Sequence, residues 1–288
     1  MSDKRKILIQ LDGDQQASVF DRVVAIDAGV DELFSYGQVT REQVQNMVHG
    51  CIFTRGPKDL ARTAIFIGGS DVAQAETLLA EAKQHLLPQF GLSVSIMLDP
   101  NGSNTTAAAA VRSATRHLDL PQTTALVMGA GAVGVRAALL LAQAGAVVQV
   151  ANRRLSKAED AVKHVLEKVP SAEVSAVPLE EAPLNEAVNR AALVIAAGPA
   201  GKQILDARLW QASSTIKVMI DLNAVPPTGI EGVEVMDAGV SRNKVTCYGA
   251  LGVGGLKMKL HKAAIAQLFT SNKLILDTEA IYALSASL

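Results

Sequence analysis

Seven short apolar runs alternate with longer stretches in which apolar residues recur at helical spacing. The runs have the length and composition of β-strands and cover residues 6–11, 63–69, 92–99, 124–129, 146–152, 192–198 and 217–223. Between them, residues 71–88 and 156–170 have the periodicity of amphipathic helices. Because strands that alternate with helices of this length form βαβ units, the pattern predicts an α/β protein with mostly parallel sheets.

The same pattern divides the chain into two domains. Residues 122–250 contain four of the strands in the order of a Rossmann-like, doubly wound dinucleotide-binding domain. An alanine-rich helix over 104–121 connects this domain to an N-terminal α/β domain of residues 1–103. A glycine-rich turn then leads into C-terminal helices, and we expect residues 255–288 to pack back on the N-terminal domain.

Composition and charge limit the kinds of molecule that the protein is expected to bind. The 288 residues are 49% hydrophobic and 19% charged, which is typical of a soluble globular protein long enough for two domains. The formal net charge is −1 and no long run carries one sign, so a nucleic-acid partner is not expected. The apolar run before Asp12 is too short for a signal peptide or membrane span, which favours a cytoplasmic protein without a membrane partner.

The two cysteines show no sign of a metal site or a disulfide framework. Cys51 and Cys247 lie far apart, with neither a CxxC spacing nor a histidine cluster nearby. We interpret both as small buried hydrophobic residues and expect no bound metal.

A glycine-rich motif follows the strand at 124–129. Gly129, Gly131 and Gly134 form a complete GxGxxG, and Ala132 and Val133 open the helix after it. In dinucleotide-binding folds the first glycine permits a tight turn, the second admits the pyrophosphate, and the third allows close packing of helix and strand. The helix N-terminus attracts the phosphates, so all five residues are predicted to bind the cofactor.

The second strand of this unit ends on Asn152, Arg153 and Arg154 instead of an acidic residue. An aspartate or glutamate there would bind the ribose 2′-hydroxyl of NAD and repel the 2′-phosphate of NADP. Two guanidinium groups and an amide donor instead suit a phosphate dianion. The three residues therefore predict NADP as the cofactor.

Two later strand ends complete the predicted cofactor site. Ala197 and Gly198 follow the strand at 192–198, and Asn223 follows the strand at 217–223. Ligands in open α/β sheets bind beyond the carboxyl ends of the strands, so these residues are expected to face the nicotinamide half of NADP. Pro226 and Pro227 fix the second loop whether or not it contacts the cofactor.

The N-terminal domain has its own polar segment, "LDPNGSNTTAAAA" at 98–110, at a predicted strand end and helix start. Helix capping explains one or two of the six polar residues within positions 99–106, so the segment favours a surface for a polar ligand over a simple turn. Within "SVFDRVVAIDAG" (18–29), Asp21 and Asp27 could instead be helix-end charges with no further role.

These segments together resemble a known family. "VFDRVVAIDAG", "DPNGSNTTAAA", "GAGAVG", "NRR", "DLNAVPPTGI" and "GALGVGGLKMKLHKA", in this order and at these intervals, closely resemble the NADP-dependent methylene-tetrahydromethanopterin dehydrogenases of bacterial one-carbon metabolism. The resemblance runs from about Ser18 to the C-terminus. It implies reversible hydride transfer from the methylene carbon of a reduced pterin carrier to NADP⁺, giving the methenyl carrier; some members also accept methylene-tetrahydrofolate.

The resemblance also implies site residues and an assembly. Lys257 would orient the carrier, although a solvated lysine on an amphipathic helix is an equally good interpretation. The family implies a homo-oligomer built on trimers. The pterin side is expected to be lined by Phe20, Asp21, Asp99, Asn101, Ser103 and Asn104.

The hydride-transfer reaction of this family needs no general acid or base. Hydride loss from an N–CH₂–N carbon leaves a resonance-stabilised amidinium cation, and no proton moves. Catalysis would then depend on positioning the carbon against the nicotinamide ring and on excluding water. We therefore predict no catalytic residue among the scattered histidines, His49, His85, His117, His164 and His261.

Three alternatives remain on the sequence alone. Shikimate dehydrogenases share the asparagine–arginine clamp, but Thr106 stands where their catalytic carboxylate would lie. A bifunctional folate dehydrogenase and cyclohydrolase would need a Tyr-x-x-x-Lys pair that we do not find. A non-catalytic NADP-sensing module would not need the polar segment at 98–110.

Overall fold

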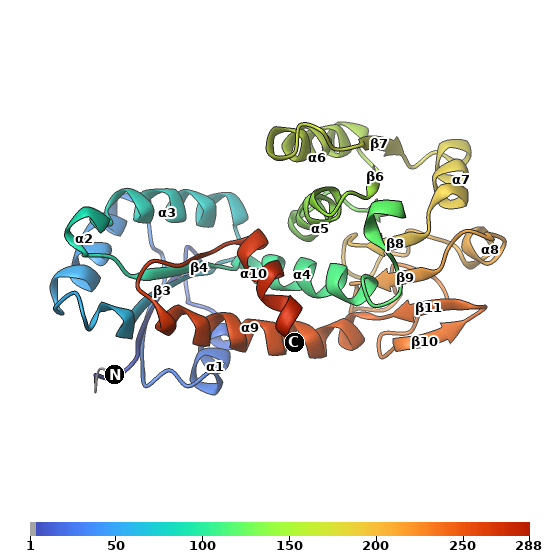
Figure 1. Ribbon diagram of the computed structural model, residues 1–288. Helices are drawn as coiled ribbons and strands as arrows, with labels where there is room; N and C mark the ends of the chain where they lie inside the picture. Colours follow the sequence, from blue (N-terminus) through green and yellow to red (C-terminus); the bar gives the residue numbers. More distant parts are fainter. Residues whose placement is uncertain (1–3) are drawn as a thin grey trace. The chain divides into compact units, whose positions relative to one another are not determined.

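The computed structural model describes residues 4–288, which divide into two compact units. Unit 1 comprises Met1–Thr105 and Met258–Leu288, and unit 2 comprises Thr106–Lys257 (Figure 1). Helices α4 (Ser103–Ala114) and α9 (Ala250–Gln267) each run from one unit into the other. No helix within residues 4–288 combines the length and apolar character that a membrane span requires.

Unit 1 is a five-stranded parallel sheet with helices on both faces. The strand order is β12-β4-β3-β1-β2, and the central strand β3 is completely buried. Helices α2 and α3 pack on one face, whereas α1 and the end of α9 cover the other (Figure 1). The strands are β1 (Ile7–Leu11), β2 (Glu32–Tyr36), β3 (Thr63–Ile67), β4 (Ser95–Leu98) and β12 (Ile275–Leu276), and the helices are α1 (Val19–Asp27), α2 (Arg41–Phe53), α3 (Val72–Gln84) and α10 (Thr278–Leu284).

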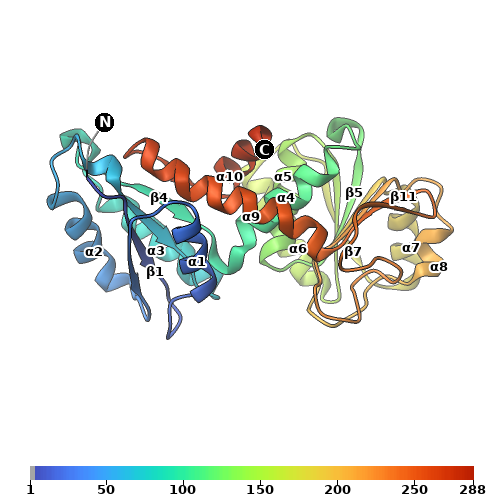
Figure 2. The same cartoon turned by 90° about the horizontal axis from the view of Figure 1, so that it is seen from below.

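Unit 2 is a seven-stranded sheet of order β10-β11-β9-β8-β5-β6-β7, parallel except for β10. Helices α5 and α6 pack on one face, and α7 and α8 pack against each other on the opposite one (Figure 2). The strands are β5 (Thr124–Met128), β6 (Val147–Asn152), β7 (Val174–Pro178), β8 (Leu193–Ala196), β9 (Val218–Asp221), β10 (Ala238–Arg242) and β11 (Val245–Tyr248). The helices are α5 (Ala132–Gln143), α6 (Leu155–Lys168), α7 (Glu181–Arg190) and α8 (Ala207–Gln211).

The predicted α/β class is confirmed, and each of the seven predicted runs contains an observed strand. The structure has five further strands that the apolar pattern does not predict, β2, β7, β10, β11 and β12. Four of them have a physical reason: β2, β7, β10 and β12 lie at sheet edges, where one side of the strand stays partly exposed and no continuous apolar run is needed.

Two predicted elements differ from the structure. The connecting helix expected over 104–121 ends at Ala114, because the chain turns at 115–117 and Pro121 lies in a separate short 3₁₀ segment. The glycine-rich "GALGVGG" is not a turn but the first part of α9. Gly252 explains this: a side chain there would meet the carbonyl carbon of Asp237 at 2.7 Å, so glycine permits close packing of the helix on backbone.

Both cysteines are buried and unpaired with each other, as predicted. Burial raises the pKa of Cys51 to about 12 and that of Cys247 to about 11. Both thiols are therefore protonated at neutral pH, and neither has the character of a reactive thiolate.

Candidate active site

In unit 2 the strand order reverses between β5 and β8, and the loops after these two strands meet there. Ala197 N donates to Met128 O at 2.8 Å, and Gly129 N donates to Ala151 O at 2.8 Å. Such a switch point, at the carboxyl ends of parallel strands, is where doubly wound folds bind nucleotides. The topology thus brings the predicted residues Gly129 and Ala197 to one place.

The three motif glycines meet different surroundings. Gly129 has φ +123°, and a side chain there would lie 2.6 Å from the carbonyl carbon of Ala197. A side chain at Gly134 would overlap the Gly129 carbonyl group, whereas one at Gly131 would meet nothing within 4 Å. Gly129 and Gly134 are therefore required by the protein's own packing. The open space at Gly131 fits a ligand that approaches the backbone, as a pyrophosphate does.

Helix α5 begins at this open space. Gly131 is its N-cap, and Ala132 and Val133 are half-buried residues of its first turn. The first amide groups of a helix have no intrahelical acceptor and carry the positive end of the helix dipole. The loop and helix therefore form a cradle that can bind the phosphates of a dinucleotide.

Asn152, Arg153 and Arg154 lie at the end of β6 and the start of α6. Asn152 Oδ1 accepts a 3.0 Å hydrogen bond from Arg154 N, which turns the chain into the helix. Both arginine side chains are exposed, and neither forms an ion pair with a carboxylate of residues 4–288 in the structure. Two exposed guanidinium groups beside the cradle fit the 2′-phosphate of NADP.

The loop after β9 is fixed by its own side chains. Asn223 is buried; its Oδ1 accepts from Gly201 N and Val225 N, and its Nδ2 donates to Pro227 O. Asn223 thus ties together the loops after β8 and β9, and its side-chain groups are used within them. Ala197 and Gly198, in the loop after β8, are half-buried and have little or no side chain. This loop therefore presents mainly its backbone to a ligand at the cradle.

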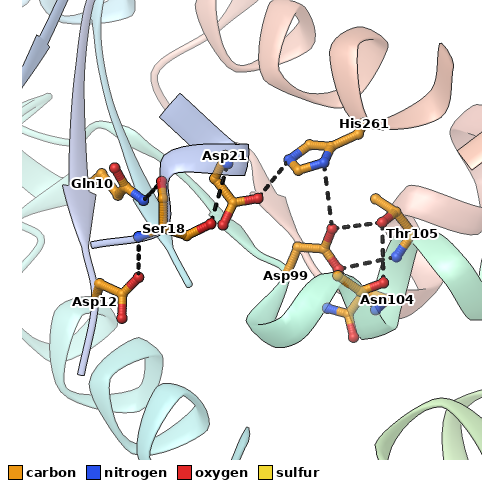
Figure 3. Close-up of polar contacts among 9 residues, drawn as sticks. Gln10, Asp12, Ser18, Asp21, Asp99, Asn104, Thr105 and His261 are labelled. Carbon is orange, nitrogen blue, oxygen red and sulfur yellow. Dashed lines mark hydrogen bonds and ion pairs between the residues drawn. The ribbon is translucent and has the colours of Figure 1, made fainter. Parts of the chain in front are cut away.

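In unit 1 the polar segment after β4 is largely a buried network (Figure 3). Asp99 Oδ1 accepts from the amides of Asn104 and Thr105, and its Oδ2 accepts from Thr105 Oγ1 at 2.6 Å. Ser103 donates to Pro100 O. The exposed fractions of Asp99, Ser103 and Asn104 are all 0%, so their side chains lie inside this network, and their predicted part in binding the carrier stays a prediction. In the structure these side chains start and anchor helix α4.

Two predicted substrate residues, Asn101 and Phe20, are exposed in unit 1, and a third, Asp21, is nearly buried. Asn101 is exposed and has φ +52°, in the left-handed region that asparagine tolerates. Phe20 in α1 is 50% exposed, and the side chain of Asp21 is 11% exposed. Lys257 is half-buried in α9, within unit 2.

A histidine that the sequence pattern does not single out also lies at this network. His261 of α9 is fully buried in unit 1, with Nε2 3.9 Å from Asp21 Oδ1 and Nδ1 4.0 Å from Asp99 Oδ2 (Figure 3). Its signal was present: His261 follows Lys257 by four residues on a predicted helix, which places both on one face.

A third carboxylate lies near the same edge of the sheet. Asp12 follows β1 and is buried, and its carboxylate accepts from the amides of Asp14 and Ser18. A side chain at Gly68 would lie 3.6 Å from Asp12 Oδ2 and 3.5 Å from Asp21 Oδ2. The carboxyl edge of this sheet is therefore strongly acidic, although residues 4–288 contain no group of side chains arranged to hold a metal ion.

Comparisons with known proteins identify the family of this chain. Residues 19–101 match the model of the N-terminal domain of methylene-tetrahydromethanopterin dehydrogenase. The chain is 42% identical to the bifunctional protein MdtA of Methylorubrum extorquens, over 98% of both chains. It is also 32% identical, over 99% of both chains, to the NAD(P)-dependent methylenetetrahydromethanopterin dehydrogenase of that organism. The chain belongs to the methylene-tetrahydromethanopterin dehydrogenase family.

Family membership confirms the resemblance and makes the protein an oxidoreductase. Residues 112–238 of this family member also match the shikimate/quinate 5-dehydrogenase model. A crystal structure of a shikimate 5-dehydrogenase from Mycobacterium fortuitum aligns with a TM-score of 0.56 and 17% identity, over 99% of both chains. This likeness concerns the fold alone, and it confirms the predicted Rossmann-like architecture.

Proposed function

We propose that the protein catalyses reversible oxidation of methylene-tetrahydromethanopterin by NADP⁺. The hydride leaves the carbon that bridges two nitrogens and joins the nicotinamide ring with its electron pair, so that the carrier becomes the methenyl cation. Methylene-tetrahydrofolate is the second proposed substrate. The observation that supports this best is the similarity over 99% of both chains to a relative named for that dehydrogenase.

The residues of unit 2 hold the cofactor in this proposal. The α5 N-terminus and Gly131 bind the pyrophosphate, and Arg153 and Arg154 bind the 2′-phosphate. The loops fixed by Asn223 shape the surface for the nicotinamide half. NADP⁺ supplies the hydride acceptor, and the two arginines make NADP the preferred form over NAD.

The carboxyl edge of the unit 1 sheet recognises the pterin carrier. Its acidic character suits a carrier that becomes cationic when it loses a hydride, because a nearby carboxylate stabilises the developing charge. In this proposal the half-exposed ring of Phe20 packs on the pterin, Asn101 contributes an amide, and Asp21 contributes a carboxylate. Lys257 orients the carrier, and it does so as a neutral amine or bonded to an oxygen acceptor, because a bare ammonium would oppose the cation.

A shikimate-type activity is the second candidate, favoured by the match over residues 112–238. That match covers the NADP-binding part alone, and Thr106 stands where the carboxylate of those enzymes is expected. We also propose, from the resemblance alone, a cytoplasmic homo-oligomer built on trimers; sedimentation analysis of the purified protein tests the oligomeric state.

The test is hydride transfer by purified protein. Both methylene carriers are assayed with NADP⁺ and with NAD⁺, following the methenyl and reduced-nicotinamide absorbance bands, with shikimate as the comparison substrate. We expect the highest kcat/KM for methylene-tetrahydromethanopterin with NADP⁺. Protein that binds NADPH yet changes neither band with any methylene pterin contradicts the proposal, and turnover of shikimate favours the second candidate.

A further inference from the structure

A cavity of about 500 Å³ lies in unit 1 between α2 and the strands β1 and β2. Met47 and Cys51 of α2 form one wall, and Ile7 and Ile9 of β1 form another. Small molecules bind in mostly apolar cavities of this size that contain a few polar groups. The residues that line this cavity differ from all those that the proposed function assigns to the cofactor or the carrier.

The cavity exists because α2 leaves the edge strand of the sheet partly uncovered. Phe34 of β2 pairs in register with Ile9 of β1, and Tyr36 pairs with Leu11, so these side chains share the α2 face of the sheet. Ile9 and Leu11 are buried there, whereas Phe34 is 46% exposed and Tyr36 is 44% exposed. Two aromatic rings therefore line the open side of the cavity, where a flat apolar ligand can pack on them.

Helix α2 also has a glycine in the wall of this cavity. Gly50 lies inside the helix, a position where glycine is less favourable than alanine. A Cβ at Gly50 would meet no atom within 4 Å, so no close contact of the protein requires a glycine there. The missing side chain therefore keeps the cavity wide at some cost to the helix.

A cation is fixed where the cavity reaches the amino ends of β1 and β3. Arg55, just after α2, is half-buried, and its Nη1 donates to Arg5 O at 3.0 Å and to Arg62 O at 2.8 Å. These two bonds use both hydrogens of Nη1 and hold the guanidinium group in place. Within residues 4–288, no carboxylate forms an ion pair with Arg55, and its Nε and Nη2 form no hydrogen bond.

The remaining edge of this guanidinium group matches a carboxylate. Nε–H and one N–H of Nη2 are parallel donors, and a carboxylate can accept both of them in a bidentate pair. Glu32 is on the same face of the sheet as Ile7, but its carboxylate is paired with Arg5. Arg55 therefore leaves a positive charge at the cavity that an anionic ligand can balance.

We propose that this cavity is a binding site for a small aromatic monocarboxylate. Arg55 binds the carboxylate, and the ring of the ligand packs against Phe34, Tyr36 and Met47. The site is independent of hydride transfer, because it uses neither the cofactor cradle of unit 2 nor the carboxyl edge of the unit 1 sheet.

The test is calorimetric titration of the full-length protein with 3-phenylpropionate and with its uncharged analogue 3-phenylpropan-1-ol. We expect a Kd of roughly 0.1–1 mM for the carboxylate, as is usual for a ligand of this size. The alcohol should bind at least about tenfold more weakly, because it lacks the charge-assisted pair with Arg55. Equal affinity for the two probes, or no saturable binding of the carboxylate, overturns the proposal.

Two variants locate the bound probe. Gly50→Leu fills the cavity and should weaken binding of 3-phenylpropionate at least about tenfold; leucine is also the better helix former, so stability in urea should be equal or higher. Arg55→Gln should weaken the carboxylate about 10- to 100-fold and leave the alcohol nearly unchanged. If Arg55→Gln does not fold, Gly50→Leu decides, and wild-type affinity in that variant overturns the proposal.

Two matched controls should keep wild-type affinity for the carboxylate. Gln45→Leu places the same side chain on an exposed position of α2 outside the cavity. Arg153→Ala with Arg154→Ala removes two exposed arginines of unit 2, and weaker binding in that variant would place the probe at the cofactor clamp and overturn the proposal. Sedimentation of Gly50→Leu completes the test: a changed oligomeric state would mean that a second copy of the chain covers this face, which also overturns it.

Discussion

Alanine substitutions at Gly134 and Gly131 should produce two different defects, a loss of stability at Gly134 and a loss of NADPH binding at Gly131. A Cβ at Gly134 would lie 2.9 Å from the carbonyl carbon of Gly129, and closer still to its oxygen. Carbon atoms pack best at about 3.5–4.0 Å, so the loop must shift by roughly 1 Å. Overpacking of this kind costs about 1–3 kcal/mol, which corresponds to a Tm lowered by about 2–12 °C at this size.

A Cβ at Gly131 meets no protein atom within 4 Å, and its φ of −85° suits any residue. The remaining stability cost is that of alanine at an N-cap, about 1 kcal/mol or less. The methyl group would instead stand where the pyrophosphate approaches the backbone. We therefore expect Gly131→Ala to weaken NADPH binding at least about tenfold, equivalent to ~1.4 kcal/mol, with nearly wild-type stability.

The assay pairs urea unfolding, followed by circular dichroism, with fluorescence titration of NADPH on the same protein samples. Each variant serves as the control for the other, because the two sites belong to one glycine motif and receive the same methyl group. Wild-type NADPH affinity in Gly131→Ala would refute the assignment of this space to the cofactor. Wild-type stability in Gly134→Ala would refute the packing argument.

Three further predictions concern the cofactor clamp, the thiols and one buried acid. Arg153→Ala with Arg154→Ala should raise KM for NADP⁺ by about 10- to 100-fold while leaving KM for NAD⁺ nearly unchanged, since a charge-assisted contact contributes about 1.5–3 kcal/mol; an unchanged preference for NADP in steady-state kinetics speaks against the clamp. Cys51 and Cys247 should not react with a thiol reagent at pH 8 until urea unfolds the protein, because burial raises both pKa values; labelling of native protein contradicts this. Burial also raises the pKa of Asp221 above 3.8, so the folded state holds this proton more tightly than the unfolded state. The free energy of unfolding of the wild type relative to Asp221→Asn should then fall as pH rises from 3.8 through the raised pKa, and a pH-independent difference in urea unfolding would count against it.

The nucleotide-binding loop could be predicted because its signals are local. A strand, three glycines at fixed spacing and a helix all lie within residues 124–143, and Gly129 and Gly134 each meet a backbone requirement close by. The pair of arginines follows at the end of the next strand, where the strand pairing of β5 and β6 sets its place. Periodicity and turn chemistry therefore suffice to predict the strand, turn and helix of this motif, whereas its contacts with the cofactor stay a prediction.

The burial of the polar segment after β4 could not be predicted from the local sequence pattern. Six polar residues within positions 99–106 are compatible with a ligand surface or with a buried network, and the sequence does not show which side chains face inward. In the structure, the Asp99 carboxylate accepts hydrogen bonds from the start of α4, and the Asn104 side chain is hydrogen-bonded to Leu98 and Thr278. Burial of polar groups is decided by partners from other elements, which the local pattern does not contain.

By itself the sequence determined the α/β class, the dinucleotide motif and the arginines that favour NADP, because periodicity, glycine spacing and charge at a strand end are short-range properties. The grouping of acidic side chains at the carboxyl edge of the unit 1 sheet could be found only from the tertiary structure. Asp21, Asp99 and His261 come from α1, the end of β4 and α9, and parallel strand order brings these distant segments to one sheet edge. The charge balance of a buried site depends on such long-range neighbours, and for that reason His261 looked like a scattered residue until the chain was folded.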